Sequence, residues 1–130
     1  MEYEYFKPHE FFCRCGKCEY DREGRGMASM SETLLAMLDL LRAKVEEPLV
    51  ISSSIRCEAH NATLPNSSLN SPHLKGLAVD IVCNCSTLRF KLVKYGFEVG
   101  FRRIEVGDTW VHLDIDPSKP QDVLWLDKKR

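Results

Sequence analysis

The chain has 130 residues and a formal net charge of −1, from 18 basic and 19 acidic residues. This length suits one domain with a single hydrophobic core, so we expect residues 1–130 to form one domain. The near-neutral charge lacks the basic excess that nucleic-acid binding needs, so nucleic acid is not an expected partner. No apolar run approaches the roughly 18 residues of a membrane-spanning helix, and residues 1–12 lack the pattern of a secretory signal peptide.

Apolar spacing and turn residues predict a mixture of helices and strands. Residues 1–28 are rich in cysteine, aromatic residues and charges but poor in aliphatic residues, so we expect an arm packed on the domain. Leucines recurring at three and four residues predict a helix over 29–46. After it we expect a strand at 49–55, a polar loop at 58–72, a strand at 77–82, a helix at 86–94, strands at 99–106 and 109–115, and a tail at 116–130. This order predicts an α+β fold with helices on one face of a small, mostly antiparallel sheet.

Three side chains near two predicted strands have the composition of a catalytic zinc site. His73 ends the polar loop, Asp80 interrupts the apolar strand at 77–82, and His112 lies in the last strand. A carboxylate inside a strand is costly unless it is paired or bound to a metal. Two imidazoles and one carboxylate supply three ligands to Zn²⁺ and leave a fourth position for water. From spacing alone, ordinary surface or hydrogen-bonded strand residues are the favoured interpretation.

The stretch Ser71-x-His73-x-x-Gly76-x-Ala78-x-Asp80 resembles the zinc-binding motif of the D-alanyl-D-alanine metallopeptidases and L-alanyl-D-glutamate endopeptidases. This family is related to the hedgehog amino-terminal domain. Three further segments resemble parts of the family in the same order: a Cys-rich opening at 12–18, an arginine-bearing segment at 52–61 and a closing motif at 111–114. The resemblance covers about residues 11–115 and implies a hedgehog-like peptidase fold.

The resemblance implies a zinc peptidase that hydrolyses peptide bonds of peptidoglycan stem peptides, or of muropeptides derived from them, through a zinc-activated water. It implies that His73, Asp80 and His112 hold one catalytic Zn²⁺. Arg56 would stabilise the oxyanion or hold a substrate carboxylate, and Ser71 would donate to the substrate's carboxylate. The peptide bond that is cut and the oligomeric state stay open.

The sequence leaves the general base of this site open among three carboxylates. Many relatives carry an acidic residue three positions before the last histidine, where this chain has Thr109. Asp108 lies four residues before His112 and would share its face on a regular strand. It is the favoured candidate because it lies at the end of the predicted hairpin, within reach of the metal-bound water, and an ordinary turn residue is the equal alternative. Glu105 and Asp114 are the alternatives, although Asp114 is better suited to orienting the imidazole of a ligand.

Trp110 alternates with His112, so the two side chains share one face of the predicted strand. Trp110 is therefore a candidate wall of a substrate cleft. A place in the hydrophobic core is the alternative interpretation.

Six cysteines, at positions 13, 15, 18, 57, 83 and 85, are many for a chain without a secretory pattern. Cys13, Cys15 and Cys18 have three interpretations. In the first they bind a second, structural zinc ion completed by Cys57, Cys83 or Cys85. In the second they form disulfides in an oxidising compartment, and in the third they are free thiols that pack as small apolar groups.

Two other functions stay open beside the peptidase. The first is a catalytically weak or inactive zinc-containing binding module on the same scaffold, and the second is a cysteine-centred metal protein. For the peptidase we expect synthesis in the cytoplasm and action at the cell wall after release or separate export. The sequence fits a phage lysis enzyme and a bacterial enzyme equally.

Overall fold

The computed structural model describes residues 2–65 and 67–127, so Met1, Asn66 and the last three residues of the predicted tail lie outside the described residues. Its helical elements are η1 (Pro8–Glu10), α1 (Arg25–Ala28), α2 (Glu32–Val45), α3 (Glu58–Thr63), η2 (Pro72–Lys75) and α4 (Ser86–Val99). Its strands are β1 (Ile51–Ser53), β2 (Ala78–Val82), β3 (Arg103–Val106), β4 (Trp110–Asp114) and β5 (Val123–Leu126).

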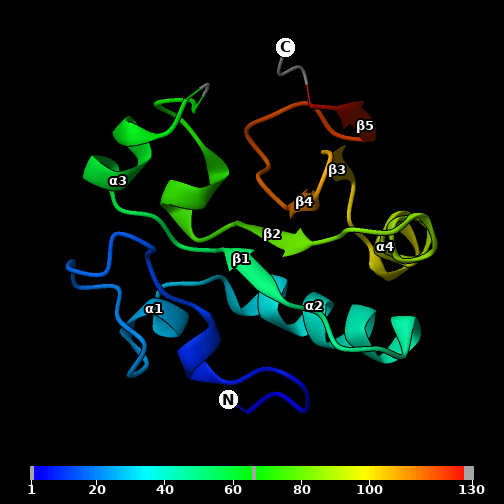
Figure 1. Ribbon diagram of the computed structural model, residues 1–130, viewed down its shortest axis with the longest axis horizontal. Helices are drawn as coiled ribbons and strands as arrows, with labels where there is room; N and C mark the ends of the chain where they lie inside the picture. The colour runs from blue at the N-terminus through cyan, green and yellow to red at the C-terminus, as the bar shows by residue number, and fades with distance from the viewer. Residues whose placement is uncertain (1, 66, 128–130) are drawn as a thin grey trace.

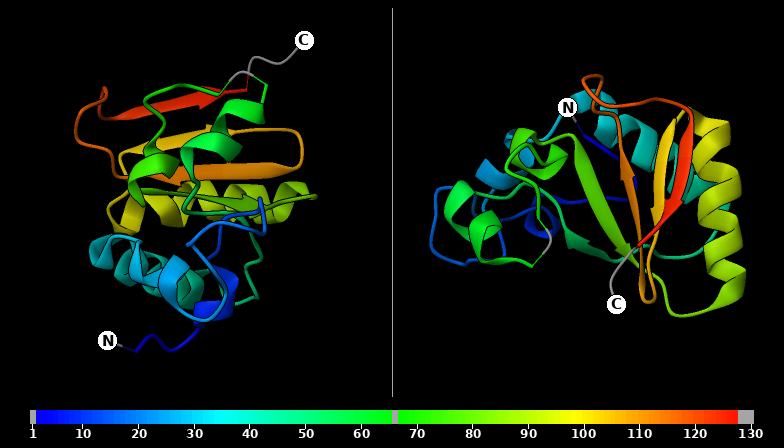
Figure 2. Two further views of the ribbon diagram at one scale, coloured as in Figure 1. Left: turned by 90° about the vertical axis from the view of Figure 1, so that its left-hand side faces the viewer. Right: turned by 90° about the horizontal axis from the view of Figure 1, so that it is seen from above.

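The strands form one five-stranded sheet in the order β1-β2-β4-β3-β5. All neighbouring strands are antiparallel except β3 and β5, which run parallel. Figures 1 and 2 show α4 on one side of the sheet, and α3 and η2 on the other. The predicted α+β fold with a mostly antiparallel sheet is therefore confirmed.

The hydrophobic core lies between the sheet and the two long helices. α2 buries its leucine stripe and α4 buries Leu92 in the same cluster that holds Val79, Ile81 and Val111 from the sheet. Gly96 lets α4 approach the sheet closely, because a Cβ there would lie 3.0 Å from Cδ1 of Ile104. The two helices thus fix the position of the sheet from one face.

Several element boundaries differ from the sequence predictions. The predicted loop 58–72 contains α3, and η2 begins at its last residue. The side chain of Cys57 accepts from His60 N and that of Ser71 accepts from His73 N, which caps these short elements. α4 continues to Val99, where a strand was expected to begin, since Gly96 packs inside the helix and does not end it. The tail was not expected to contain β5, which pairs with β3 along its whole length.

The N-terminal arm contributes directly to the core. Phe6 and Phe11 are 3% and 0% exposed and belong to the same hydrophobic cluster as α2. Their rings pack edge to face, with centroids 5.8 Å apart. The arm therefore contributes to the core through aromatic side chains. Among the described residues, none of the helices has both the length and the apolar character that crossing a bilayer requires.

Asp116 ties the turn after β4 to the end of η2. Its carboxylate is fully buried and accepts from Lys75 Nζ at 3.0 Å and from the Ser118 hydroxyl at 2.7 Å. Burial raises the pKa of Asp116, but the hydrogen bonds from Ser118 and the charge of Lys75 outweigh this and hold the pKa below its ordinary value. The charged carboxylate is therefore the form that stabilises the fold.

Replacing this carboxylate by an amide, Asp116→Asn, should lower the free energy of unfolding at pH 7 by about 1–3 kcal/mol. A folded pKa below the unfolded value gives stability that is present above about pH 4 and is lost as pH falls through the folded pKa. The difference between wild type and variant should therefore shrink in acid, which denaturant titrations at several pH values measure. Asp122→Asn is the matched control, because Asp122 also pairs with a basic side chain, that of Arg102, but is exposed. An equal effect of both substitutions at pH 7 would contradict this account.

Candidate active site

Four side chains form one row across the face of the sheet that α2 and α4 do not cover. Asp80 on β2 is the register partner of His112 on β4, His112 is the partner of Glu105 on β3, and Glu105 is the partner of Trp125 on β5. Their neighbours along the strands, such as Val79 and Val111, point into the core. Alternation along each strand therefore gathers these side chains on one face.

His73 enters this row from η2 and is only 4% exposed. Its Nδ1 lies 2.8 Å from the carbonyl oxygen of Ser54, and its Nε2 lies 3.3 Å from Oδ1 of Asp80. Because a carbonyl oxygen only accepts, Nδ1 carries a hydrogen, and Nε2 is the nitrogen directed toward Asp80. The ring is thus held with one nitrogen directed into the site.

Each ring nitrogen of His112 has a carboxylate partner. Its Nε2 lies 2.7 Å from Oδ2 of Asp114 and its Nδ1 lies 2.9 Å from Oδ1 of Asp80. Burial lowers the pKa of His112, but hydrogen bonds to Asp114 and Asp80 outweigh it and raise the pKa to about 9. Asp114 is in turn bound by Arg103, with Nε 2.6 Å from Oδ1. Asp114 therefore orients the ring of His112, and Arg103 balances the charge of Asp114.

Asp80 lies between the two imidazoles. Burial raises the pKa of Asp80, but the charges and hydrogen bonds of His73 and His112 outweigh it and hold the pKa well below its ordinary value. The group is accordingly an ionised carboxylate in the interior of a sheet. Such a group requires positive charge close by.

The donor set fits a divalent metal ion. One ligand atom each from His73, Asp80 and His112 lie within 4.8 Å of one another. Both imidazoles bind a fixed acceptor through their other nitrogen, which is the usual arrangement around metal-binding histidines. Two histidines and a carboxylate are ligands that zinc accepts.

Arg56 lies beside this group and is 9% exposed. One terminal nitrogen donates to Oδ1 of Asn61 at 2.7 Å and the other to the Ser53 hydroxyl at 3.2 Å. Burial lowers the pKa of Arg56, while the charge of Asp80 raises it. Among the described residues, Nε of Arg56 has no hydrogen-bond partner. The guanidinium group of Arg56 is therefore held in a fixed orientation beside Asp80.

A cleft of about 420 Å³ opens above the row of side chains. It is lined by the three clustered residues together with Arg56, Ser71, Glu105, Trp110 and Trp125. The predicted wall residue Trp110 thus faces the cleft. Ser71 is mostly buried, and its hydroxyl accepts from His73 N at 3.2 Å. The group of three therefore lies where a molecule from solvent can reach it.

Asp108, which the sequence favours as general base, lies elsewhere. It is exposed in the turn between β3 and β4, and the described lining of the cleft includes Glu105 but not Asp108. The reason is that β4 begins at Trp110, so the alternation that would align Asp108 with His112 does not extend to it. Glu105 is half-buried directly opposite His112. Burial raises the pKa of Glu105, and the charge of His112 opposes this.

Sequence reasoning missed Trp125, Arg103 and the carbonyl of Ser54. The ring of Trp125 packs edge to face against His112, with centroids 6.0 Å apart, and Arg103 stacks over Trp125 at 4.8 Å. The apolar patch at 123–126 was the available signal for Trp125. No local signal pointed to Arg103 or Ser54, because their roles depend on strand register.

Comparisons with known proteins support the fold and the family of this chain. The profile of the family described as peptidase M15 matches residues 4–114. A solved structure, that of Serratia marcescens L-Ala D-Glu endopeptidase ChiX, has the same fold with a TM-score of 0.54 and 19% sequence identity. The match covers 69% of this chain and 83% of that chain. No curated protein matches the chain.

Gly76→Ala tests how the chain holds His73. Gly76 ends η2 with φ +70°, and a Cβ there would overlap the carbonyl oxygen of Ser29. We expect the substitution to lower the free energy of unfolding by about 2–5 kcal/mol. Gly24→Ala is the control, since φ is also positive there but the space is open, and it should cost only about 1–2 kcal/mol. Denaturant titrations measure both losses of unfolding free energy. Equal losses for the two variants would show that the close approach of Gly76 to Ser29 does not contribute to stability.

Proposed function

We propose that this chain, which belongs to the peptidase M15 family, hydrolyses a peptide bond in the stem peptides of bacterial peptidoglycan. The observation that carries the proposal is the convergence of His73, Asp80 and His112 at an open cleft. The fold shared with an L-Ala D-Glu endopeptidase supports peptidoglycan peptides as the substrate class. The proposal includes action at the cell wall, where such peptides occur.

In this proposal His73, Asp80 and His112 hold one zinc ion. A bound Zn²⁺ supplies a Lewis acid that lowers the pKa of water to about 7 and polarises the carbonyl of the substrate. Asp114 keeps the hydrogen on Nε2 of His112 and so leaves Nδ1 available as a ligand. The backbone carbonyl of Ser54 does the same for the ring of His73.

The residues around the ligands have separate proposed roles. Arg56 stabilises the negative charge that develops on the carbonyl oxygen, or binds a carboxylate of the substrate, through its fixed guanidinium fork. Ser71 donates its hydroxyl hydrogen to the substrate. Trp110 and Trp125 form walls that exclude water from the bound peptide. These side chains come from different elements, so the fold has to be complete before the site exists.

Glu105 is the general base in this proposal, in place of Asp108. It lines the cleft and lies opposite His112 in the sheet, whereas Asp108 is exposed in a turn. Its carboxylate accepts a proton from the attacking water and returns it to the departing amine. Position in the cleft decides between the two candidates, because a base has to reach the water from which it takes the proton.

His73→Ala and Asp80→Ala should each remove the one zinc ion held in the cleft and reduce hydrolysis of purified muropeptides below detection. Zinc content by elemental analysis and product masses by mass spectrometry are the two measurements. His9→Ala is the control, because His9 is exposed on the arm and should leave both unchanged. Full hydrolysis after chelation would contradict the proposal, and bound zinc without hydrolysis of any stem peptide would favour a binding module. Product masses also distinguish cleavage at L-Ala–D-Glu from cleavage at D-Ala–D-Ala.

Glu105→Gln should lower kcat by a factor of about 10²–10⁴ with zinc content unchanged, because the ligands remain while the proton acceptor is lost. Asp108→Asn should stay within a few-fold of wild type. Steady-state kinetics on one defined muropeptide compares the two variants directly. The opposite ranking, with Asp108→Asn inactive and Glu105→Gln active, would return the role of base to Asp108.

A further inference from the structure

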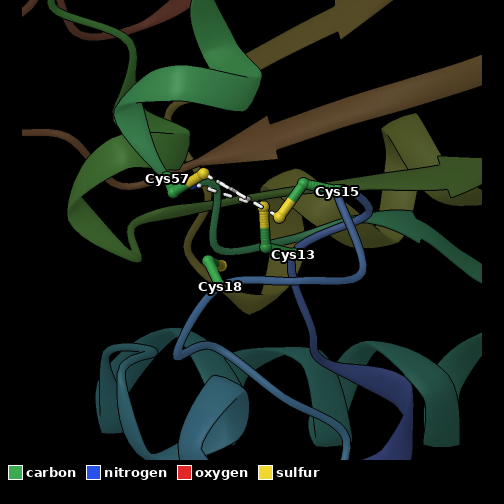
Figure 3. Close-up of side chains that lie close together, drawn as sticks. All are labelled: Cys13, Cys15, Cys18 and Cys57. Atoms are coloured by element: carbon green, nitrogen blue, oxygen red, sulfur yellow. Dashed lines mark hydrogen bonds between the residues drawn. The ribbon is translucent and has the colours of Figure 1, made fainter.

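Four cysteine side chains gather at the junction of the N-terminal arm and the segment before α3. Cys13, Cys15 and Cys18 lie in the arm, and Cys57 directly follows Arg56. Figure 3 shows their side chains pointing toward one another. The four sulfur atoms all lie within 4.8 Å of one another, so residues distant in the chain form one compact group.

The sulfur spacing matches a tetrahedral metal site. Sγ of Cys57 lies 3.8 Å from Sγ of Cys13 and 4.0 Å from Sγ of Cys15. A tetrahedron with zinc–sulfur bonds of about 2.3 Å has sulfur–sulfur edges of about 3.8 Å. A disulfide requires about 2.05 Å, and all six cysteines of the chain are free thiols in the structure.

Three of the four sulfur atoms accept hydrogen bonds from backbone N–H groups. The backbone N–H groups of Cys57, Lys17 and His60 each lie 3.4 Å from a sulfur atom, those of Cys13, Cys15 and Cys57 respectively. Hydrogen bonds from N–H groups stabilise the charged form of sulfur, which is the form that binds metals. Cys13 is buried and the other three are half-buried, so an ion held there would be largely shielded from solvent.

We propose that Cys13, Cys15, Cys18 and Cys57 hold a second Zn²⁺ in a closed, structural four-sulfur site. Four protein ligands fill the tetrahedron and leave no position for water or substrate, so the ion is not catalytic. Tetrahedral sulfur sites take zinc or iron. A multi-iron cluster would separate its cysteines further, because several metal ions and sulfides lie between them, so a single ion fits this group.

The consequence of such an ion is a fixed position for Arg56. Cys57 is its neighbour in the chain and also caps α3, which carries Asn61, the partner of the guanidinium. An ion that joins the arm to Cys57 therefore also fixes the backbone at Arg56, on one side of the cleft. This role is independent of whether the cleft hydrolyses peptides.

The test is the zinc content of the full-length protein, purified under reducing conditions and measured by elemental analysis. Wild type should carry two zinc ions per chain, and Cys18→Ser should carry one. Cys85→Ser is the matched control and should keep two, since Cys85 lies outside the group. His73→Ala should also carry one ion, and that ion should be the sulfur-bound one.

The identity of the remaining ion does not depend on altering any cysteine. His73→Ala protein loaded with Co²⁺ should show an intense sulfur-to-cobalt charge-transfer absorption, whereas the peptidase site alone would give none. A His73→Ala protein without bound metal, iron in place of zinc, or a disulfide within the group by non-reducing mass spectrometry would overturn the proposal. Muropeptide hydrolysis with a single zinc ion would uphold the proposed function while overturning this inference. Two zinc ions without hydrolysis would uphold this inference while overturning the proposed function.

Discussion

The structure of the candidate site depends on one buried carboxylate. Asp80 lies in the middle of β2 between Val79 and Ile81, both of which are fully buried in the core. The core therefore fixes the position of the carboxylate, and its charge requires positive partners nearby. His73 and His112 reach it from a helical turn and a neighbouring strand. A divalent ion bound among the three would satisfy this requirement and make the arrangement a catalytic centre.

The alternation of side chains that builds the core also builds the site. Leu113 points into the core, and on either side of it His112 and Asp114 point to the other face, where Arg103 balances the charge of Asp114. α2 and α4 hold the sheet from behind, so the side chains on its open face stand on a rigid support (Figure 2). Strands of a packed sheet hold reacting groups in position more precisely than loops do. The same alternation of side chains along the strands therefore produces both the core and the candidate site.

Local patterns predicted the long elements and marked His73, Asp80 and His112 as candidates, and the resemblance to a known family then assigned these three as ligands. The leucine spacing of 29–46 predicted α2, and a carboxylate in an apolar strand singled out Asp80. Features that depend on distant pairing were missed. Asp108 was favoured by assuming a regular strand that begins only at Trp110, and Glu105 is aligned with His112 by strand register. The fourth cysteine of the group stayed open among Cys57, Cys83 and Cys85, because tertiary structure alone brings position 57 to the arm.

Anomalous X-ray scattering at the zinc absorption edge, from crystals of the full-length protein, tests the central claim most directly. The account predicts a peak within bonding distance of Nε2 of His73, Oδ1 of Asp80 and Nδ1 of His112, with no fourth protein ligand. A zinc-supplemented crystal without a peak there would contradict it. So would a peak whose fourth position is filled by another side chain of the protein, because no place would remain for the attacking water.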